Sequence, residues 1–300
     1  MTLKKLSEKN TSIRDVQLVA LKLLKIVDKI CRDNNIEYVL DGGTLLGAIR
    51  YGKFIPWDDD IDIAMTRENY EKFLSIAKEK LPKEVFLQNL QTTDKAENTW
   101  TQIKDRNSKV EIFGGNEQHP GIYLDIFPYD YYSENRIKRF RELFLKKLYI
   151  KVYAINSPFK RPFLQKKNLN KNLVKLIVKV IAFPFAFYNN KLIYKKNLKT
   201  RFRRIEKLKN NSRKVIGYGT DVLNFNNVWN KDTIYPLKEI RFEDGLFFAP
   251  GNTHEYLSVL YGEDYMTPPP EDKRQCHSSN VKIGLTEEEF YNINKNFQYK

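Results

Sequence analysis

The chain of 300 residues contains few of the residues that build cross-linked or zinc-bound domains. It has two cysteines, Cys31 and Cys276, and three histidines. The cysteines are far apart in the sequence, and no zinc-finger spacing is present. We therefore expect neither a disulfide framework nor a structural zinc site. Cys31 falls on an apolar helical face and is expected in the core.

Long apolar runs are also absent. The chain opens with the polar stretch MTLKKLSEKN, and the apolar stretch that ends at Tyr188 is interrupted by lysines and by Pro184. The uncharged part of that stretch is too short to span a bilayer. We therefore expect a cytoplasmic protein in a reducing environment. The hydrophobic content of 41% is still enough for a substantial core.

Acidic residues are nearly missing from the middle of the chain. The net charge is +15, but residues 136–214 hold 25 of the 52 lysines and arginines and only two acids. That segment carries +23 and the remainder carries −8. The pattern indicates one electropositive surface that faces an anionic partner. A nucleic-acid-binding protein is one alternative, although few aromatic residues in the segment are placed for base stacking.

Hydrophobic spacing predicts an α/β (α+β) fold. Helices are expected at 12–33, 44–50, 67–80 and 252–262, and strands at 36–40, from about 60, and at 121–130, where Pro128 ends the strand. A hairpin is expected at 240–250, and an extended, proline-stiffened segment at 266–277. We divide the chain into a core (1–133), a basic and mainly helical insertion (134–214), and a C-terminal part (215–300) that packs back on the core.

Four aspartates fall within five positions of the stretch DGGTLLGAIRYGKFIPWDDDIDIAM, residues 41–65. In an extended segment Asp58, Asp60 and Asp62 share one face, while Ile61 and Ile63 face the core. Carboxylates held this close repel one another unless a divalent cation neutralises them. Their hard oxygen ligands favour Mg²⁺ or Mn²⁺.

A pair of glycines precedes the aspartates, where a strand turns into a helix. Without side chains at Gly42 and Gly43, backbone N–H groups can approach a phosphate closely, and Thr44 adds a hydroxyl. A phosphate cradle beside a cation site suggests metal-assisted phosphoryl transfer. A solvated turn and the Asp-x-Asp site of a sugar-nucleotide glycosyltransferase are alternatives. An EF-hand loop does not fit, because Ile63 and Asn69 stand where it needs Gly and Glu.

The stretch GGTLLGAIRYGKFIPWDDDIDI resembles the signature of the LicD family, within the nucleotidyltransferase superfamily. YLDIFPYD and YLSVLYGEDYMTPPPEDKR add to this resemblance, which covers roughly residues 25–130 and 235–280. The family is similar to phosphocholine transferases and related to fukutin-type transferases. The resemblance implies a nucleotidyltransferase-like mixed sheet core with helices, and the basic middle corresponds to the family's variable part.

The resemblance also implies site residues. Asp60 and Asp62 occupy the paired metal positions, Asp58 is a further metal ligand or a supporting residue, and Asp125 is the third, catalytic carboxylate. The residues implied to contact the donor are Gly42, Gly43, Thr44, Arg50, Lys104, Arg274 and His277. The implied cofactor is Mg²⁺ or Mn²⁺.

The activity implied is transfer of phosphocholine from CDP-choline to a hydroxyl of a bacterial cell-surface glycan (teichoic acid, lipopolysaccharide or capsule), with release of CMP. The acceptor would be a lipid-linked or polymer glycan. A CDP-ribitol or CDP-glycerol phosphate transferase is the nearest alternative, and the sequence does not separate choline from an alditol. No nucleic-acid partner is expected.

A basic amphipathic helix is predicted at 171–181. Lys171, Lys175 and Lys179 share one face, and apolar residues fill the other. Such a helix suits contact with an anionic membrane surface, although it equally suits packing on the core. The first alternative would place this cytoplasmic protein at the inner face of the cytoplasmic membrane as a peripheral protein, and the second would not.

Overall fold

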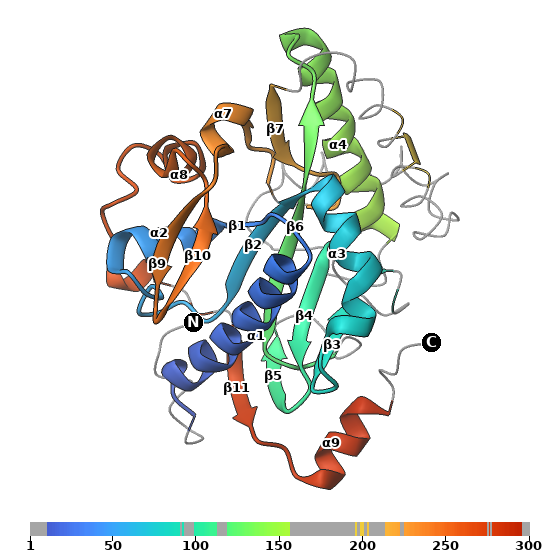
Figure 1. Ribbon diagram of the computed structural model, residues 1–300, viewed down its shortest axis with the longest axis vertical. Coiled ribbons are helices and arrows are strands. Elements are labelled where there is room, and N and C mark those ends of the chain that lie inside the picture. The colour runs from blue at the N-terminus through green and yellow to red at the C-terminus, as the bar shows by residue number, and fades with distance from the viewer. Residues whose placement is uncertain are drawn as a thin grey trace, which may run out of the picture. The chain divides into compact units, whose positions relative to one another are not determined.

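A computed structural model describes residues 11–90, 92, 99–112, 119–156, 196, 199–200, 203, 214–222, 225–274, 276 and 278–295. The chain divides into two compact units, residues 1–130 with 214–300, and residues 131–213. Helices and a mixed sheet make up the first unit, so the predicted α/β class is confirmed (Figure 1).

The helices of the first unit are α1 (Ile13–Asp33), α2 (Gly42–Tyr51), α3 (Arg67–Lys80), α7 (Lys231–Ile234), α8 (Thr253–Tyr261) and α9 (Glu287–Asn294), with a 3₁₀ turn at Glu271–Lys273. The strands are β1 (Val39–Leu40), β2 (Ile61–Thr66), β3 (Val85–Gln88), β4 (Thr101–Asp105), β5 (Ser108–Ile112), β6 (Tyr123–Tyr132), β7 (Val215–Tyr218), β8 (Val228–Asn230), β9 (Lys238–Phe242), β10 (Gly245–Ala249) and β11 (Ser278–Ile283). The last two residues of β6 belong to the second unit.

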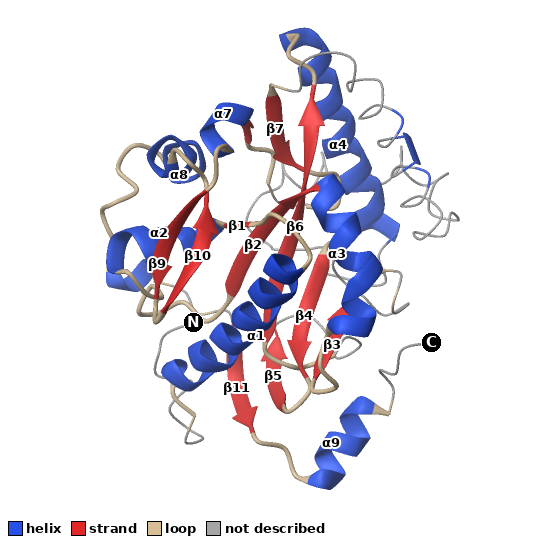
Figure 2. Ribbon diagram, viewed as in Figure 1, coloured by secondary structure: helices blue, strands red, loops and turns tan. Residues whose placement is uncertain are grey.

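The main sheet is built around a parallel pair. Its order is β1-β2-β6-β4-β3, and β7 pairs with both β6 and β8 (Figure 2). Strands β2 and β6 run parallel, whereas β1 and β4 pair antiparallel with them. Leu124 and Ile126 of β6 are fully buried, as are Ile61 and Ile63 of β2. The centre of the sheet is therefore covered on the face to which these residues point.

Local sequence explains the first two helices. A capping box between Ser12 and Asp15 starts α1, whose apolar face is buried. Asp41 caps α2, which ends at Gly52 in the left-handed conformation (φ 66°). Helix α1 contacts β2, β4 and α3, while α2 contacts β2, β9 and α8. The predicted helices 12–33 and 67–80 are confirmed, and α2 begins two residues before the predicted start.

Two predictions about strands are wrong in detail. Strand β1 contains only Val39 and Leu40 rather than residues 36–40. Strand β6 continues through Pro128 to Tyr132. Its pairing with β4 reaches only Ile126, so the missing N–H of Pro128 breaks no hydrogen bond on that side. The carbonyl of Pro128 accepts a hydrogen bond from the Gly219 N–H at 2.8 Å.

The predicted hairpin and helix near the C-terminus are confirmed as β9–β10 and α8. In the second unit, α4 (Arg136–Asn156) is described. The predicted helix at 171–181 lies outside the described residues. None of the helices described here is both long enough and apolar enough to cross a bilayer. Cys31 is fully buried, and burial raises the pKa of its thiol, in line with a core role.

A buried charge cluster joins distant parts of the first unit. Arg67, at the start of α3, pairs with Asp130 of β6 at 2.9 Å and with Asp221, which follows β7. The arginine side chain is 3% exposed, and both carboxylates are fully buried. Removing one charged side chain from such a cluster leaves a buried charge that no opposite charge compensates.

Changing Arg67 to Met should therefore destabilise the fold strongly. The substitution keeps an unbranched side chain but leaves two buried carboxylates without their cation, a loss of about 3–5 kcal/mol. Asp33→Ala is the matched control, because the Lys29–Asp33 pair is exposed and such pairs contribute about 1 kcal/mol or less. Urea unfolding measures both. A loss for Arg67→Met no larger than for the control would contradict the structural role of the cluster.

Candidate active site

An acidic cluster forms where β2 and β6 lie side by side. Asp62 of β2 and Asp125 of β6 are register partners in the parallel pair. Neighbouring strands lie about 4.8 Å apart, so the two side chains leave the same face of the sheet next to each other. Asp58 and Asp60 reach the cluster from the loop that precedes β2.

Asp58 and Asp60 do not share a strand face with Asp62, contrary to the prediction, because β2 begins only at Ile61. The loop is instead held by α1. Gln17, which is 4% exposed, donates from Nε2 to the carbonyl of Asp58 at 2.8 Å. A hydrogen bond from a side chain of α1, rather than pairing within a strand, therefore holds the acidic loop in place.

The glycine pair lies directly against these carboxylates. A Cβ atom on Gly42 would lie 2.7 Å from Oδ2 of Asp62, and one on Gly43 would lie 2.5 Å from Oδ2 of Asp58. Both distances are too short for a side chain. Gly42 also has a φ of 51°, which favours glycine. The glycines therefore let the N-terminus of α2, with its partial positive charge, approach the acidic cluster.

Burial and mutual repulsion disfavour the charged forms of these acids. The pKa values of Asp58 and Asp62 are raised well above the usual range, first by burial and then by the charge of Asp60. Burial raises the pKa of Asp125 to about 7. Gln102 opposes that rise with a hydrogen bond from Nε2 to Oδ1 of Asp125 at 2.8 Å.

A divalent cation fits this donor set. The cluster offers only carboxylate oxygens, the ligand type that suits Mg²⁺ or Mn²⁺, and a cation there would offset the burial and repulsion that raise these pKa values. Among the described residues, however, no group of three or more acids, histidines or cysteines is arranged so that it could hold a metal ion. Mg²⁺ is commonly held by only one or two carboxylates, with water and substrate phosphate completing its shell, so the fit here rests on ligand type.

Asp41 is a site residue that the sequence analysis missed. It accepts hydrogen bonds on Oδ1 from the hydroxyls of Tyr218, at 2.9 Å, and Tyr256, while its own N–H is bonded to the carbonyl of Asp62. Its other oxygen, Oδ2, is buried and has no partner within the described part of the chain. Burial raises the pKa of Asp41. The sequence does contain a signal for Asp41, because an aspartate just before the glycine pair stands where the N-cap of a helix is expected.

Three implied donor-binding residues are engaged in the fold. Thr44 accepts a hydrogen bond on Oγ1 from the Asp62 N–H at 2.9 Å, which ties α2 to β2. Arg50 donates from Nη2 to the carbonyl of Tyr265, while its buried Nε has no partner among the residues that the structure describes. Lys104 is fully buried and donates to the carbonyl of His119 at 2.7 Å.

Arg274 lies beside the acidic loop. Its guanidinium carbon is 4.3 Å from the centre of the Trp57 ring, and Trp57 immediately precedes Asp58. Arg274 also bonds to Glu271 and to the carbonyl of Pro269. The structure thus brings this part of the C-terminal segment to the loop. His277 lies outside the described residues.

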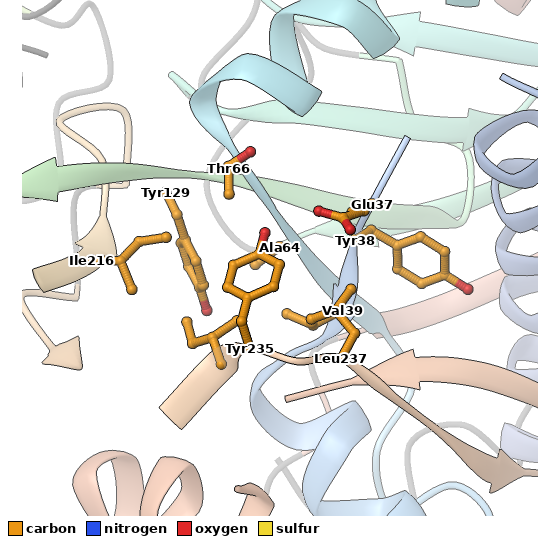
Figure 3. A pocket seen from close by; sticks show the side chains of 10 residues that line it. Glu37, Tyr38, Val39, Ala64, Thr66, Tyr129, Ile216, Tyr235 and Leu237 are labelled. Atoms are coloured by element: carbon orange, nitrogen blue, oxygen red, sulfur yellow. The ribbon is translucent and has the colours of Figure 1, made fainter. Parts of the chain in front are cut away.

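A small pocket lies on the same sheet face, further along β2 and β6. Figure 3 shows its lining, which includes Ala64 and Thr66 of β2 and Tyr129 of β6. The Tyr129 hydroxyl is hydrogen-bonded to that of Tyr256, which bonds to Asp41. The pocket lining contains one ionisable acid, Glu37, and none of the clustered aspartates. It is therefore separate from the acidic cluster.

Comparison with known proteins defines the class. A family model described as "LicD/FKTN/FKRP, nucleotidyltransferase domain" matches residues 35–169. The chain is 31% identical to the lipopolysaccharide cholinephosphotransferase LicD of Haemophilus influenzae over 278 residues, 90% of this chain and 97% of that protein. It is also 31% identical to the uncharacterized protein RT0683 of Rickettsia typhi over 117 residues, 39% of this chain and 36% of that protein.

The fold and the comparisons together define a transferase with a nucleotidyltransferase domain. The chain belongs to the LicD family. The family resemblance drawn from the glycine and aspartate motifs is thereby confirmed.

The repulsion within the cluster makes a testable prediction about stability. Asp62→Asn keeps the volume and removes a disfavoured charge, so the Tm in EDTA should rise by a few degrees, since 1 kcal/mol corresponds to about 1–2 °C in a chain of this size. Because the folded pKa of Asp62 is raised, the wild-type protein loses stability as pH rises, and the gain should be larger at pH 8 than at pH 5.

Asp130→Asn is the matched control, because it removes a buried charge that Arg67 compensates. Its Tm should fall. Calorimetry measures both variants, and circular dichroism checks that the secondary structure is retained. A fall for Asp62→Asn similar to that of Asp130→Asn would show that the cluster is not repulsive.

Proposed function

We propose that this protein transfers phosphocholine from CDP-choline to a hydroxyl of a bacterial cell-surface glycan and releases CMP. The observation that carries the proposal is the carboxylate cluster at the N-terminus of α2. The similarity along 90% of the chain to a lipopolysaccharide cholinephosphotransferase supports the choice of transferred group and acceptor. Lipopolysaccharide, teichoic acid and capsule are all acceptors of this chemical class.

In the proposed complex the donor pyrophosphate lies against the start of α2. The first N–H groups of a helix have no partner inside the helix. Asp41 accepts the N–H of Gly42 at 2.7 Å, so the N–H groups of Gly43 and Thr44 are the ones proposed to meet the phosphates. Arg50, whose Nε has no partner among the described residues, is proposed to pair with a phosphate oxygen. Mg²⁺ or Mn²⁺ held by Asp58, Asp60, Asp62 and Asp125 would neutralise charge on the phosphates.

The reaction is an in-line displacement. The hydroxyl oxygen of the acceptor attacks the phosphorus that carries choline, a new P–O bond forms, and the P–O bond to CMP breaks. Asp125 is proposed to hold the attacking hydroxyl and take up its proton, and Gln102 orients that carboxylate through its hydrogen bond. CMP leaves with the electron pair of the broken bond.

A panel of donors tests this proposal. We expect CMP release with acceptor glycan from CDP-choline, more slowly from CDP-ribitol or CDP-glycerol, and none in EDTA until Mg²⁺ or Mn²⁺ is restored. Asp60→Asn and Asp62→Asn should lower turnover by orders of magnitude with the fold intact, whereas Asp33→Ala should leave it unchanged. Faster CMP release from CDP-ribitol or CDP-glycerol than from CDP-choline would show that the transferred group is an alditol phosphate and not phosphocholine. Turnover of a UDP-sugar without any release of CMP would identify a glycosyltransferase.

We also propose that the protein works at a membrane surface, where a lipid-linked acceptor is found. The described part of α4 supports this. Ile137, Phe140 and Phe144 recur at helical spacing and are 74%, 70% and 57% exposed. Arg136 and Lys147 border this apolar face on one side, and Arg141 borders it on the other. An apolar face bordered by basic residues suits an anionic lipid surface.

Liposome sedimentation tests the membrane contact. The wild-type protein should bind liposomes that contain an anionic lipid, bind neutral ones poorly, and lose affinity with salt, since each basic residue contributes about 1 kcal/mol. Replacing both Phe140 and Phe144 by Gln should weaken binding about tenfold. The control replaces Phe290 and Tyr291 of α9, which are also exposed. Equal binding by both double variants would refute a contact through α4.

A further inference from the structure

Aromatic side chains from three segments meet next to Asp125. Phe127 lies two residues further along β6 and therefore on the same face of the sheet. Trp100, just before β4, is edge-on to Phe127 with ring centres 5.6 Å apart. Phe225 is edge-on to Phe127 at 6.3 Å and stacks on Tyr218, the last residue of β7, at 5.0 Å. We call Trp100, Phe127 and Phe225 the aromatic patch.

The sheet register explains why these rings meet. Thr101 is the register partner of Ile126 in the antiparallel β4–β6 pair, so Trp100 continues toward Phe127. The end of β7 is joined to β6 by the hydrogen bond from the Gly219 N–H to the Pro128 carbonyl. Strand pairing in the main sheet therefore places the aromatic patch next to Asp125, although Trp100 and Phe225 lie 125 positions apart in the sequence.

The patch is accessible at Phe225, Trp100 is half-buried, and Phe127 lies buried between them with 5% exposure. Phe225 is 41% exposed, and its ring stacks on the buried Tyr218. The polar ends of the adjoining rings point to acids. The Tyr218 hydroxyl donates to Asp41, and the Trp100 N–H faces Asp125 and lowers its pKa, though without normal hydrogen-bond geometry. The surface offered to a ligand is therefore aromatic faces beside negative charge.

We infer that the aromatic patch binds the quaternary ammonium of the donor, an inference that rests on the proposed function. Ring faces attract cations that water solvates weakly, and nearby carboxylates add to the attraction. Phe127 stands one two-residue step, about 7 Å, from Asp125. The two-carbon bridge of choline spans a distance of this order from the phosphorus. An alditol chain would need hydrogen-bonding partners, which these ring faces do not supply.

The position of the patch favours choline over the cytosine base. Asp125 is proposed to lie at the attacked phosphorus, and choline is bonded to that phosphorus, whereas the cytidine is one phosphate further away. Aromatic rings also stack on bases, so base binding is the competing outcome. The two are separated by comparing CDP-choline with CDP, which shares the nucleotide but lacks choline.

Calorimetric binding to Phe225→Leu tests the inference. Leu keeps an apolar side chain and removes the ring face, so affinity for CDP-choline should fall about tenfold, or about 1.4 kcal/mol. Affinity for CDP should change less than twofold. Phe225→Trp should restore CDP-choline binding, and Phe290→Leu on α9, at 38% exposed, is the matched control. Trp100→Leu provides a second test from another segment.

Several outcomes would overturn the inference. If the variants lose affinity for CDP and for CDP-choline equally, the aromatic patch binds the cytosine base and not choline. If neither Phe225→Leu nor Trp100→Leu loses affinity, the aromatic patch does not contact the donor. Wild-type protein that releases CMP from CDP-choline while the variants bind normally would refute the patch and keep the proposed function. Wild-type protein that neither binds CDP-choline nor releases CMP from it would refute both.

Discussion

Repulsion among buried carboxylates is the constraint on which the rest of the site depends. Asp58, Asp62 and Asp125 have raised pKa values, and the charge of Asp60 contributes to each rise. The groups around the cluster offset this repulsion only in part. The start of α2 comes close because Gly42 and Gly43 carry no side chains. In the proposed function a cation and the donor offset the remaining charge, so the feature that lowers stability is also the one that would bind them.

The topology makes this arrangement rigid. The parallel β2–β6 pair sets Asp62 beside Asp125, and β4 brings Gln102 to the latter. The C-terminal segment then returns to the same place. Tyr218 and Tyr256 lie 177 and 215 positions after Asp41, to which both donate. These long-range contacts mean that the site is complete only when the two sequence-distant parts of the first unit fold together.

The sequence revealed what depends on local spacing. Helices α1 and α3 follow from apolar periodicity, and the alternating Ile61, Asp62 and Ile63 follow from strand period. The pairing of Asp125 with the other acids required the family resemblance, because no local pattern links two strands that are some sixty residues apart. Gln17, Gln102 and Asp41 were missed for the same reason, since their roles come from partners on other elements. Pro128 was wrongly predicted to end its strand. The strand can contain this proline because β4 pairs with β6 only as far as Ile126, which the local sequence does not show.

The central claim is that the acidic cluster is a divalent-cation site completed by the donor. Direct titration with Mn²⁺, followed by electron paramagnetic resonance, tests it without any assay of turnover. The account predicts weak binding alone, tighter binding with CDP-choline present, and loss of both in Asp62→Asn with the fold retained. Mn²⁺ binding that is equal in Asp62→Asn and wild type, or that ignores the donor, would contradict it.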